Sequence, residues 1–290
     1  MPDAGPLGPA TVVVLGLLSA ASFGASDFGG GLSSRRLPLF GVMLVSNSAA
    51  VVLALAIALA TREAAPDTSS MVAAALGGVC GAVGLIGLYR GLAVGRMGVV
   101  APVVGVIGAS LPVLVGIAVE GAPHPLVALG IGLALVAVVV VSRTPSPGGG
   151  RSGIEFALLG GIGIGLVSAL IGQLPAGSVW WPLVILKTTA ILSIVTMIVV
   201  ARRPWRIQSR SVLPPAAVGL GDMAGNGFYV LATQSGRLDI AVVLSSLYPV
   251  VTILLAITLL RERISRQHAV GIAAAALAVA LIALGSNQAG

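Results

Sequence analysis

The chain has 290 residues, of which 57% are hydrophobic and 9% are charged, and its mean hydropathy is +1.08. A soluble domain carries about 25% charged residues, so a chain this apolar cannot cover its own surface in water. The net charge of +7 does not indicate nucleic-acid binding, because the basic residues form no cluster on a soluble face. The single cysteine, Cys80, lies in an apolar run, which excludes a disulfide or a multi-cysteine metal site within one chain. Composition therefore predicts an integral membrane protein.

Apolar stretches of about 20 residues follow one another along the whole chain. A helix rises about 1.5 Å per residue, so each stretch can cross a hydrocarbon core about 30 Å thick once. The opening residues MPDAGPLGPA lack the positive region of a secretory signal peptide, so we expect the first helix to be retained. The expected fold class is an all-α integral membrane protein with ten transmembrane helices. The predicted helices span residues 10–33, 38–60, 70–93, 97–119, 125–142, 154–174, 180–200, 212–235, 239–260 and 267–285.

Matching features recur in the two halves of the chain at a nearly constant separation. Tyr89 corresponds to Tyr229 (229 − 89 = 140), and Glu120 corresponds to Glu262 (262 − 120 = 142). Chance matching in a chain rich in Gly, Ala and Val is the alternative explanation. Five helices per repeat is an odd number, so the second repeat must enter the membrane from the opposite side, as in many secondary transporters. The sequence predicts a first five-helix repeat at 1–142, a linker at 143–153 and a second, inverted repeat at 154–290.

The distribution of arginine gives an independent prediction of orientation, because Lys and Arg near helix ends favour the cytoplasm. Connectors after the odd-numbered helices hold thirteen arginines, whereas those after the even-numbered helices hold only Arg62 and Arg237. The thirteen are Arg35, Arg36, Arg90, Arg96, Arg143, Arg151, Arg202, Arg203, Arg206, Arg210, Arg261, Arg263 and Arg266. This bias predicts that both termini lie outside the cell.

Several stretches carry a resemblance to a known family. They are SFGASDFGGGLSSRRLP, APVVGVIGASLPV and AVVLSSLYPVVTILLAITLLRERISRQHAVGI, which accompany the five-plus-five duplication. Together they resemble the drug/metabolite transporter superfamily, specifically its EamA-like members. The most specific part is Pro249 within a helix, Glu262 at its end and Gly271 in the next helix. The resemblance implies ten helices, a central substrate cavity between the repeats, and alternating-access movement of metabolites, often as efflux.

Three ionisable residues lie within the predicted helices, namely Asp27, Lys187 and Asp222. Such a residue costs about 2.5–3.5 kcal/mol on insertion scales, so it usually faces a protein interior or a water-filled path. Asp27 lies among serines and the glycines 29–31, where small residues allow a ligand or another backbone to approach closely. Either carboxylate can bind a proton in exchange for substrate, or pair with a substrate ammonium. The structural alternative is that one of them forms an ion pair with Lys187.

A polar stripe runs along the predicted eighth helix. Asp222, Asn226, Tyr229 and Thr233 are spaced i, i+4, i+7 and i+11, which places them on one helical face. A stripe of this kind inside an apolar helix indicates a lumen, and Tyr89 is its counterpart in the first half. We expect Asn226 and Tyr229 to orient the ligand.

Further polar residues and prolines are weaker candidates. Interhelical hydrogen bonding explains the polar residues equally well, and they are Asn47, Gln173, Ser245, Ser246 and Tyr248. The prolines Pro102, Pro112 and Pro249 remove backbone donors and permit either a hinge or a static kink. The tryptophans Trp180, Trp181 and Trp205 lie at predicted boundaries, as interfacial anchors do.

These observations favour a secondary active transporter of small polar or amphipathic, amino-acid-like metabolites, with proton-coupled efflux by alternating access. The alternatives are a passive facilitator or channel, and a multidrug exporter of organic cations. No nucleophile with a base and no Walker sequence is present, so neither an enzyme nor a cofactor or metal is expected. The expected partners are the lipid bilayer, a small-molecule substrate and protons. The resemblance and fifteen arginines against one lysine predict a bacterial inner membrane.

Overall fold

The structure is a computed structural model that describes residues 9–120, 125–143, 153–171, 177, 179–234, 244–245, 247–261 and 266–286. Within these residues the chain forms ten α-helices, one short 3-10 helix and no strand. The α-helices are α1 (Pro9–Arg36), α2 (Leu39–Thr61), α3 (Thr68–Val94), α4 (Met97–Glu120), α5 (Pro125–Arg143), α6 (Ile154–Ile171), α7 (Trp180–Ala201), α8 (Leu213–Gln234), α10 (Tyr248–Leu260) and α11 (Arg266–Ser286). The 3-10 helix is η1 (Ser209–Ser211).

The predicted helices agree with the observed ones to within a few residues at most ends, so the all-helical fold class is confirmed. The predicted helix over 239–260 is the main exception. It has Pro249 in its interior, whereas α10 begins at Tyr248 and Pro249 stands in the first turn. Proline is favoured there because its missing N–H would be unpaired in any case. Pro249 therefore lies in the first turn of α10 and does not kink that helix. Residues 239–243 and 246 lie outside the described part of the chain.

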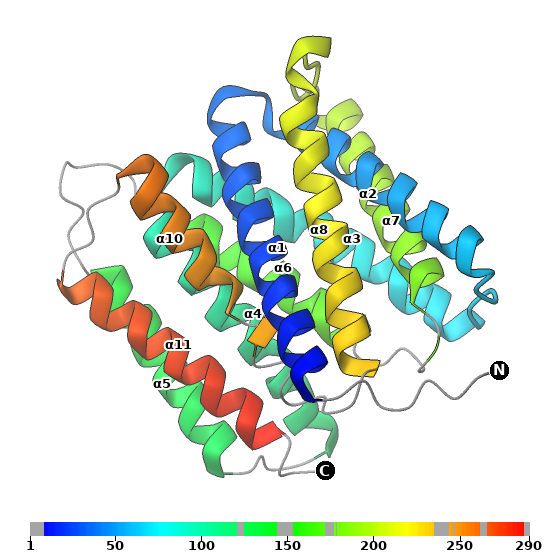
Figure 1. Ribbon diagram of the computed structural model, residues 1–290. Helices are drawn as coiled ribbons and strands as arrows, with labels where there is room; N and C mark the ends of the chain where they lie inside the picture. Colours follow the sequence, from blue (N-terminus) through cyan, green and yellow to red (C-terminus); the bar gives the residue numbers. More distant parts are fainter. Residues whose placement is uncertain are drawn as a thin grey trace.

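Helices of the first half pack mainly against helices of the second half. The main contacts pair α3 with α6 and α7, α1 with α8 and α10, α4 with α6 and α11, and α2 with α7 and α8. The helices α5 and α11 pack on each other at one edge of the bundle (Figure 1). Exchanging the two halves maps the α3–α6 contact onto α1–α8, and the α3–α7 contact onto α2–α8. This is the pairing that the predicted repeat would produce.

Two glycine contacts repeat at nearly the same separation. A Cβ atom built on Gly78 of α3 would overlap the carbonyl oxygen of Leu186 in α7. One built on Gly219 of α8 would overlap the carbonyl oxygen of Ser46 in α2. The partners are separated by 140 (186 − 46) and 141 (219 − 78) residues. In both places only glycine lets the α3 or α8 backbone come this close to the neighbouring helix.

The α3–α6 crossing is built from glycine on both sides. A Cβ on Gly87 would overlap the backbone nitrogen of Gly160, and one on Gly84 would lie 3.0 Å from the carbonyl carbon of Gly163. Gly91 also contacts the α6 side, where its added Cβ would lie 3.3 Å from Cβ of Phe156. The two backbones therefore touch there without side chains between them.

The outer surface of the bundle is apolar. Large hydrophobic side chains remain exposed on many helices, among them Val52 at 68%, Leu129 at 64%, Val199 at 69% and Leu254 at 54%. In water such a surface would associate, whereas hydrocarbon solvates it. Among the described residues, α2, α3 and α7 are long and apolar enough to cross a membrane by length and composition.

Arginine-bearing segments at the end of α1 and before α8 lie at one end of the bundle. The end of α1 and the start of α8 lie at the upper end in Figure 1, while the start of α1 and the end of α11 lie at the lower end. The end of α1 carries Arg35 and Arg36, and the segment before α8 carries Arg206 and Arg210. The arginines that precede α2 and α8 therefore share one end of the molecule.

A carboxylate ties α2 to the start of α7. Oε1 of Glu63 accepts the backbone N–H of Val179 at 2.7 Å, and its Oε2 accepts that of Trp180 at 2.8 Å. The indole N–H of Trp181 donates to the Glu63 carbonyl oxygen at 3.0 Å. An acidic side chain at a helix N-terminus satisfies unpaired N–H groups and complements the helix dipole. This contact fixes the loop after α2 on a helix of the other half.

Candidate functional site

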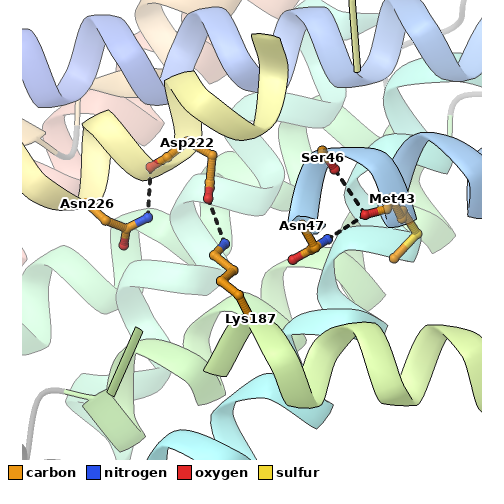
Figure 2. Close-up of polar contacts among 6 residues, drawn as sticks. All are labelled: Met43, Ser46, Asn47, Lys187, Asp222 and Asn226. Carbon is orange, nitrogen blue, oxygen red and sulfur yellow. Dashed lines mark hydrogen bonds and ion pairs between the residues drawn. The ribbon is translucent and has the colours of Figure 1, made fainter. Parts of the chain in front are cut away.

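The interior of the bundle holds an ion pair between α7 and α8. The Nζ atom of Lys187 lies 2.6 Å from Oδ2 of Asp222, and the side chains are 10% and 24% exposed (Figure 2). The structural alternative that one aspartate pairs with Lys187 is therefore realised, and Asp222 is the partner. Two opposite charges at this distance and depth attract strongly, but each has lost most of its hydration.

A small cavity adjoins this pair. It is lined by Ser46, Asn47, Ala50, Leu85, Tyr89, Lys187, Gly219 and Asp222, which come from α2, α3, α7 and α8. Its volume of about 10 Å³ is close to the space that one water molecule needs. The cavity therefore has no room for a metabolite in this conformation.

Asn47 brings an unpaired hydrogen-bond acceptor to the cavity. Its Nδ2 atom donates to the carbonyl oxygen of Met43 at 2.8 Å, whereas its Oδ1 has no partner among the described residues. Asn47 is only 3% exposed, so this oxygen is also shielded from water. Figure 2 shows the amide oxygen directed toward the side where Lys187 and Asp222 lie. A buried acceptor left unpaired is costly, which makes it a prime contact for a donor that enters the cavity.

Tyr89 closes the cavity on the α3 side. Its ring packs so tightly on α1 that a Cβ atom on Gly30 would overlap the ring carbons. Its hydroxyl is within hydrogen-bonding reach of Ser46, and it senses the charges of Asp27 and Asp222. At glycines 29–31 the groups that approach closely are side chains and not a ligand or a backbone: Val218 at Gly29, the Tyr89 ring at Gly30 and Leu92 at Gly31.

Asp27 of α1 is the second carboxylate of this region. It is partly buried and makes no hydrogen bond or ion pair with any described residue. It interacts electrostatically with Lys187, which attracts it, and with Asp222, which repels it. Asp222 therefore has a counter-ion in direct contact, and Asp27 does not.

The other predicted site residues occupy different surroundings. Asn226 donates its amide to the carbonyl oxygen of Asp222 in its own helix at 2.8 Å, so this group is not directed at the cavity (Figure 2). Tyr229 is partly buried on α8 and does not line the cavity. Tyr248 stacks edge-on against Phe23, with ring centroids 6.4 Å apart, and lies in the electrostatic range of Asp27. Ser245 is buried, and its hydroxyl has no partner among the described residues.

Some predicted residues cannot be placed. Gln173, Ser246, Glu262 and the side chain of Thr233 lie outside the described residues. In the described part of the chain, no group of three or more His, Cys, Asp and Glu side chains could hold a metal ion.

Two residues with contacts described above, Ser46 at the cavity and Glu63 at the start of α7, were not predicted from sequence. Ser46 precedes Asn47 and lines the cavity, yet serine is common in helix contacts and gives no signal of its own. Glu63 directly follows a helix end, and nothing in its neighbourhood shows that it reaches α7. The predicted repeat does offer a signal for the cavity, because Asn47 and Lys187 are separated by 140 residues (187 − 47).

Comparison with known proteins agrees with the sequence resemblance over the second half. Residues 151–284 match the model of the EamA-like transporter family, a match consistent with the drug/metabolite transporter superfamily. No curated protein matches the chain. A solved structure entitled "Crystal structure of protein" is similar to it, with a TM-score of 0.62 and 19% sequence identity. The likeness covers 97% of this chain and 99% of that chain, so it shows the same fold over nearly the whole length. The apolar helices and the family match make the protein a multi-span membrane protein.

Proposed function

We propose that this chain, whose second half matches the EamA-like transporter family, is a secondary active transporter of small, polar, amino-acid-like metabolites. The observation that supports this best is the set of three charged side chains, Asp27, Lys187 and Asp222, that α1, α7 and α8 bring together in the interior. Buried charges are expensive in a membrane protein and mark substrate or proton pathways.

The charge balance of this set assigns a role to Asp27. Two carboxylates and one ammonium leave a net charge of −1 when all are ionised, and Lys187 already pairs with Asp222. Asp27 is therefore the group that a proton can neutralise. We propose that Asp27 carries this proton in exchange for outward-moving substrate, because an ionised Asp27 favours a substrate ammonium nearby and a protonated one does not.

The two predicted five-helix repeats supply the moving parts of this proposal. The interior charges lie where helices of both halves meet, and the helix pairing is preserved when the halves are exchanged. Alternating access by rocking of one repeat against the other would open this region to each side in turn. The arginine bias favours an orientation with the termini outside, in a bacterial inner membrane.

Transport in proteoliposomes tests the proposal. Vesicles that are more acidic inside than outside should accumulate labelled amino acids as protons leave, and the pH gradient should no longer drive accumulation by the Asp27→Asn variant. Ser168→Ala, which removes an exposed hydroxyl that bonds its own helix, serves as the control and should keep the coupling. Accumulation that is unaffected by the gradient would identify a passive facilitator instead.

A second function is favoured by the same carboxylate. A substrate that carries only an ammonium could pair with Asp27 and leave the Lys187–Asp222 ion pair intact. This describes an exporter of organic cations. Inclusion of simple amines among the transported compounds separates the two functions.

A further inference from the structure

The cavity has two equivalent walls with different chemistry. Asn47 of α2 and Lys187 of α7 are separated by 140 residues, and both line the cavity. Under exchange of the two halves they occupy the same position, yet one presents a neutral acceptor and the other a cation. Asp222 lies next to Lys187 and also lines the cavity. The site therefore has one cation, Lys187, and two acceptors, Asp222 and Asn47. A ligand with opposite charges at its two ends requires such a combination.

The Lys187–Asp222 ion pair forms part of the cavity wall. The cavity of about 10 Å³ cannot admit a metabolite while the two side chains are in contact at 2.6 Å. A substrate that binds inside this cavity must separate them, and separating a buried pair leaves two charges without compensation. Only a substrate that brings a carboxylate for Lys187 and an ammonium for Asp222 restores both partners without changing the net charge.

The unpaired Oδ1 atom of Asn47 indicates where the ammonium end of a substrate would bind. An ammonium has three N–H donors, so one bond to Asp222 leaves two that need acceptors. Oδ1 of Asn47 is buried, lines the same cavity and has no partner among the described residues. The atom assignment of this amide follows from its contact, because the carbonyl oxygen of Met43 can accept only from nitrogen.

We infer that the Lys187–Asp222 ion pair is the empty-state substitute for a zwitterionic substrate, whose carboxylate binds Lys187 and whose ammonium binds Asp222 and Oδ1 of Asn47. This inference rests on the proposed transport function and assigns its substrate class to particular atoms. Among the described residues, Tyr89 of α3 lines the cavity with the pair, Asp27 of α1 lies within electrostatic range of the pair, and Tyr248 of α10 lies within electrostatic range of Asp27. None of these three offers a second cation, so Lys187 is the carboxylate receptor.

Matched ligands test the inference. Within each of three sets, the compounds share a side chain and differ in whether they carry both charged groups, the ammonium alone or the carboxylate alone. The sets are L-alanine, ethylamine and propionate; L-leucine, isopentylamine and 4-methylpentanoate; and L-phenylalanine, phenethylamine and 3-phenylpropionate. Binding to the purified full chain, measured by calorimetry and by competition for transport, should favour the amino acid of at least one set by roughly tenfold or more over both analogues, since each analogue leaves one buried charge unpaired.

Three variants locate the preference. Removal of Lys187 alone would leave Asp222 unpaired, so the double variant Lys187→Gln with Asp222→Asn replaces the pair by neutral groups of similar size. It should elute as a single species and lose the preference for the amino acid over the amine. Asn47→Ala should weaken amino-acid binding about three- to tenfold. Ser48→Ala changes the next residue of α2, which is exposed, and should have no effect.

The outcomes separate the inference from the proposed function. Equal binding of amine and amino acid by the wild type, or a preference that survives in the folded double variant, overturns the inference and leaves transport intact. If the wild type transports no compound of any set, the proposed function fails and the inference fails with it.

Discussion

The α3–α6 and α1–α8 contacts correspond when the two halves are exchanged, but they are built differently. Between α3 and α6 the glycines 84 and 87 face the glycines 163 and 160, and backbone touches backbone. Between α1 and α8 the glycines of α8 meet side chains, since Gly225 lies against the Phe23 ring and Gly221 against the Ser26 hydroxyl. The first contact has no side chains between the two backbones, and the second borders both interior carboxylates.

If the two halves are the predicted repeats, this difference lies between two equivalent contacts, one without side chains and one with polar groups. A backbone contact without side chains gains close packing and tolerates no added atom. A contact that includes hydroxyls and a carboxylate gives up some of that packing and gains groups that can bind a proton or a ligand. The stripe of α8 has no polar counterpart in α3 apart from tyrosine, because Asp222 corresponds to Ala82 (222 − 82 = 140).

The largest expected effect on stability comes from adding one methyl group to the α3–α6 contact. Gly87→Ala makes the new Cβ overlap the backbone nitrogen of Gly160 and places it 2.7 Å from the carbonyl oxygen of Phe156. Neither backbone atom can move without shifting a helix. We therefore expect the variant to lose stability by an amount at or above the upper end of the usual range for overpacking, about 1–3 kcal/mol. Size-exclusion chromatography of the expressed variant tests this expectation, because a strongly destabilised variant should not elute as a single species.

The control for this change is Gly132→Ala in α5, where no atom lies within 4 Å of the added Cβ. It should keep or slightly raise the unfolding temperature, because alanine favours helix. A well-folded Gly87→Ala variant would contradict the close α3–α6 contact.

The next effect concerns a helix end at which the two halves also differ. Glu63 follows the left-handed cap Arg62, and the corresponding Arg203 follows the left-handed cap Arg202. Glu63→Ala leaves the N–H groups of the α7 start unpaired, and hydrogen bonds to a charged group contribute about 1.5–3 kcal/mol. We expect a clear fall in the unfolding temperature in detergent. Arg203→Ala should change it little, and equal effects of the two variants would refute the asymmetry.

A smaller effect tests the polar contact of α1 with α8. The Ser19 hydroxyl donates to the carbonyl oxygen of Gly225 at 2.9 Å and is fully buried. Interhelical hydrogen bonds in membrane proteins average about 0.6 kcal/mol, so Ser19→Ala should lower stability by about that amount. Ser168→Ala removes a hydroxyl that is exposed and bonds its own helix. Unfolding in denaturant should distinguish the two variants, and an identical stability would argue against the Ser19 bond.

The smallest effect lies outside the membrane, at the start of α3. Asp67 accepts the N–H groups of Ser69 at 3.1 Å and Ser70 at 3.4 Å, and it accepts both serine hydroxyls. These bonds lower the pKa of Asp67 to about 2. A depressed pKa stabilises the fold above the unfolded value of about 3.9, and this contribution is lost as the pH falls through about 2.

The difference in unfolding temperature between the wild type and Asp67→Ala should therefore be constant down to about pH 4 and shrink between about pH 4 and 2. An asparagine side chain also caps a helix but does not titrate, so the Asp67→Asn variant should show no such trend relative to alanine. A difference that grows as the pH falls would reverse the sign required by the Asp67 hydrogen bonds.

Length, hydropathy and spacing predict most of the fold, because a bilayer requires every spanning segment to be a long apolar helix. They also identify Asp27, Lys187 and Asp222 as interior groups, because charges are rare and costly there. The choice of Asp222 as the partner of Lys187 depends on how α7 and α8 are rotated, which no single helix encodes. The same holds for Asn226, whose side chain has a competing acceptor one turn back in its own helix.

Proton movement driven by substrate tests the central claim most directly. Proteoliposomes that contain a pH-sensitive dye and the wild-type protein are given an outward gradient of a transported amino acid, with no initial pH difference. Exchange at Asp27 predicts that protons enter as substrate leaves, and that Asp27→Asn abolishes the pH change while exchange of labelled for unlabelled substrate continues. A pH change of the same size in the Asp27→Asn variant would contradict the account.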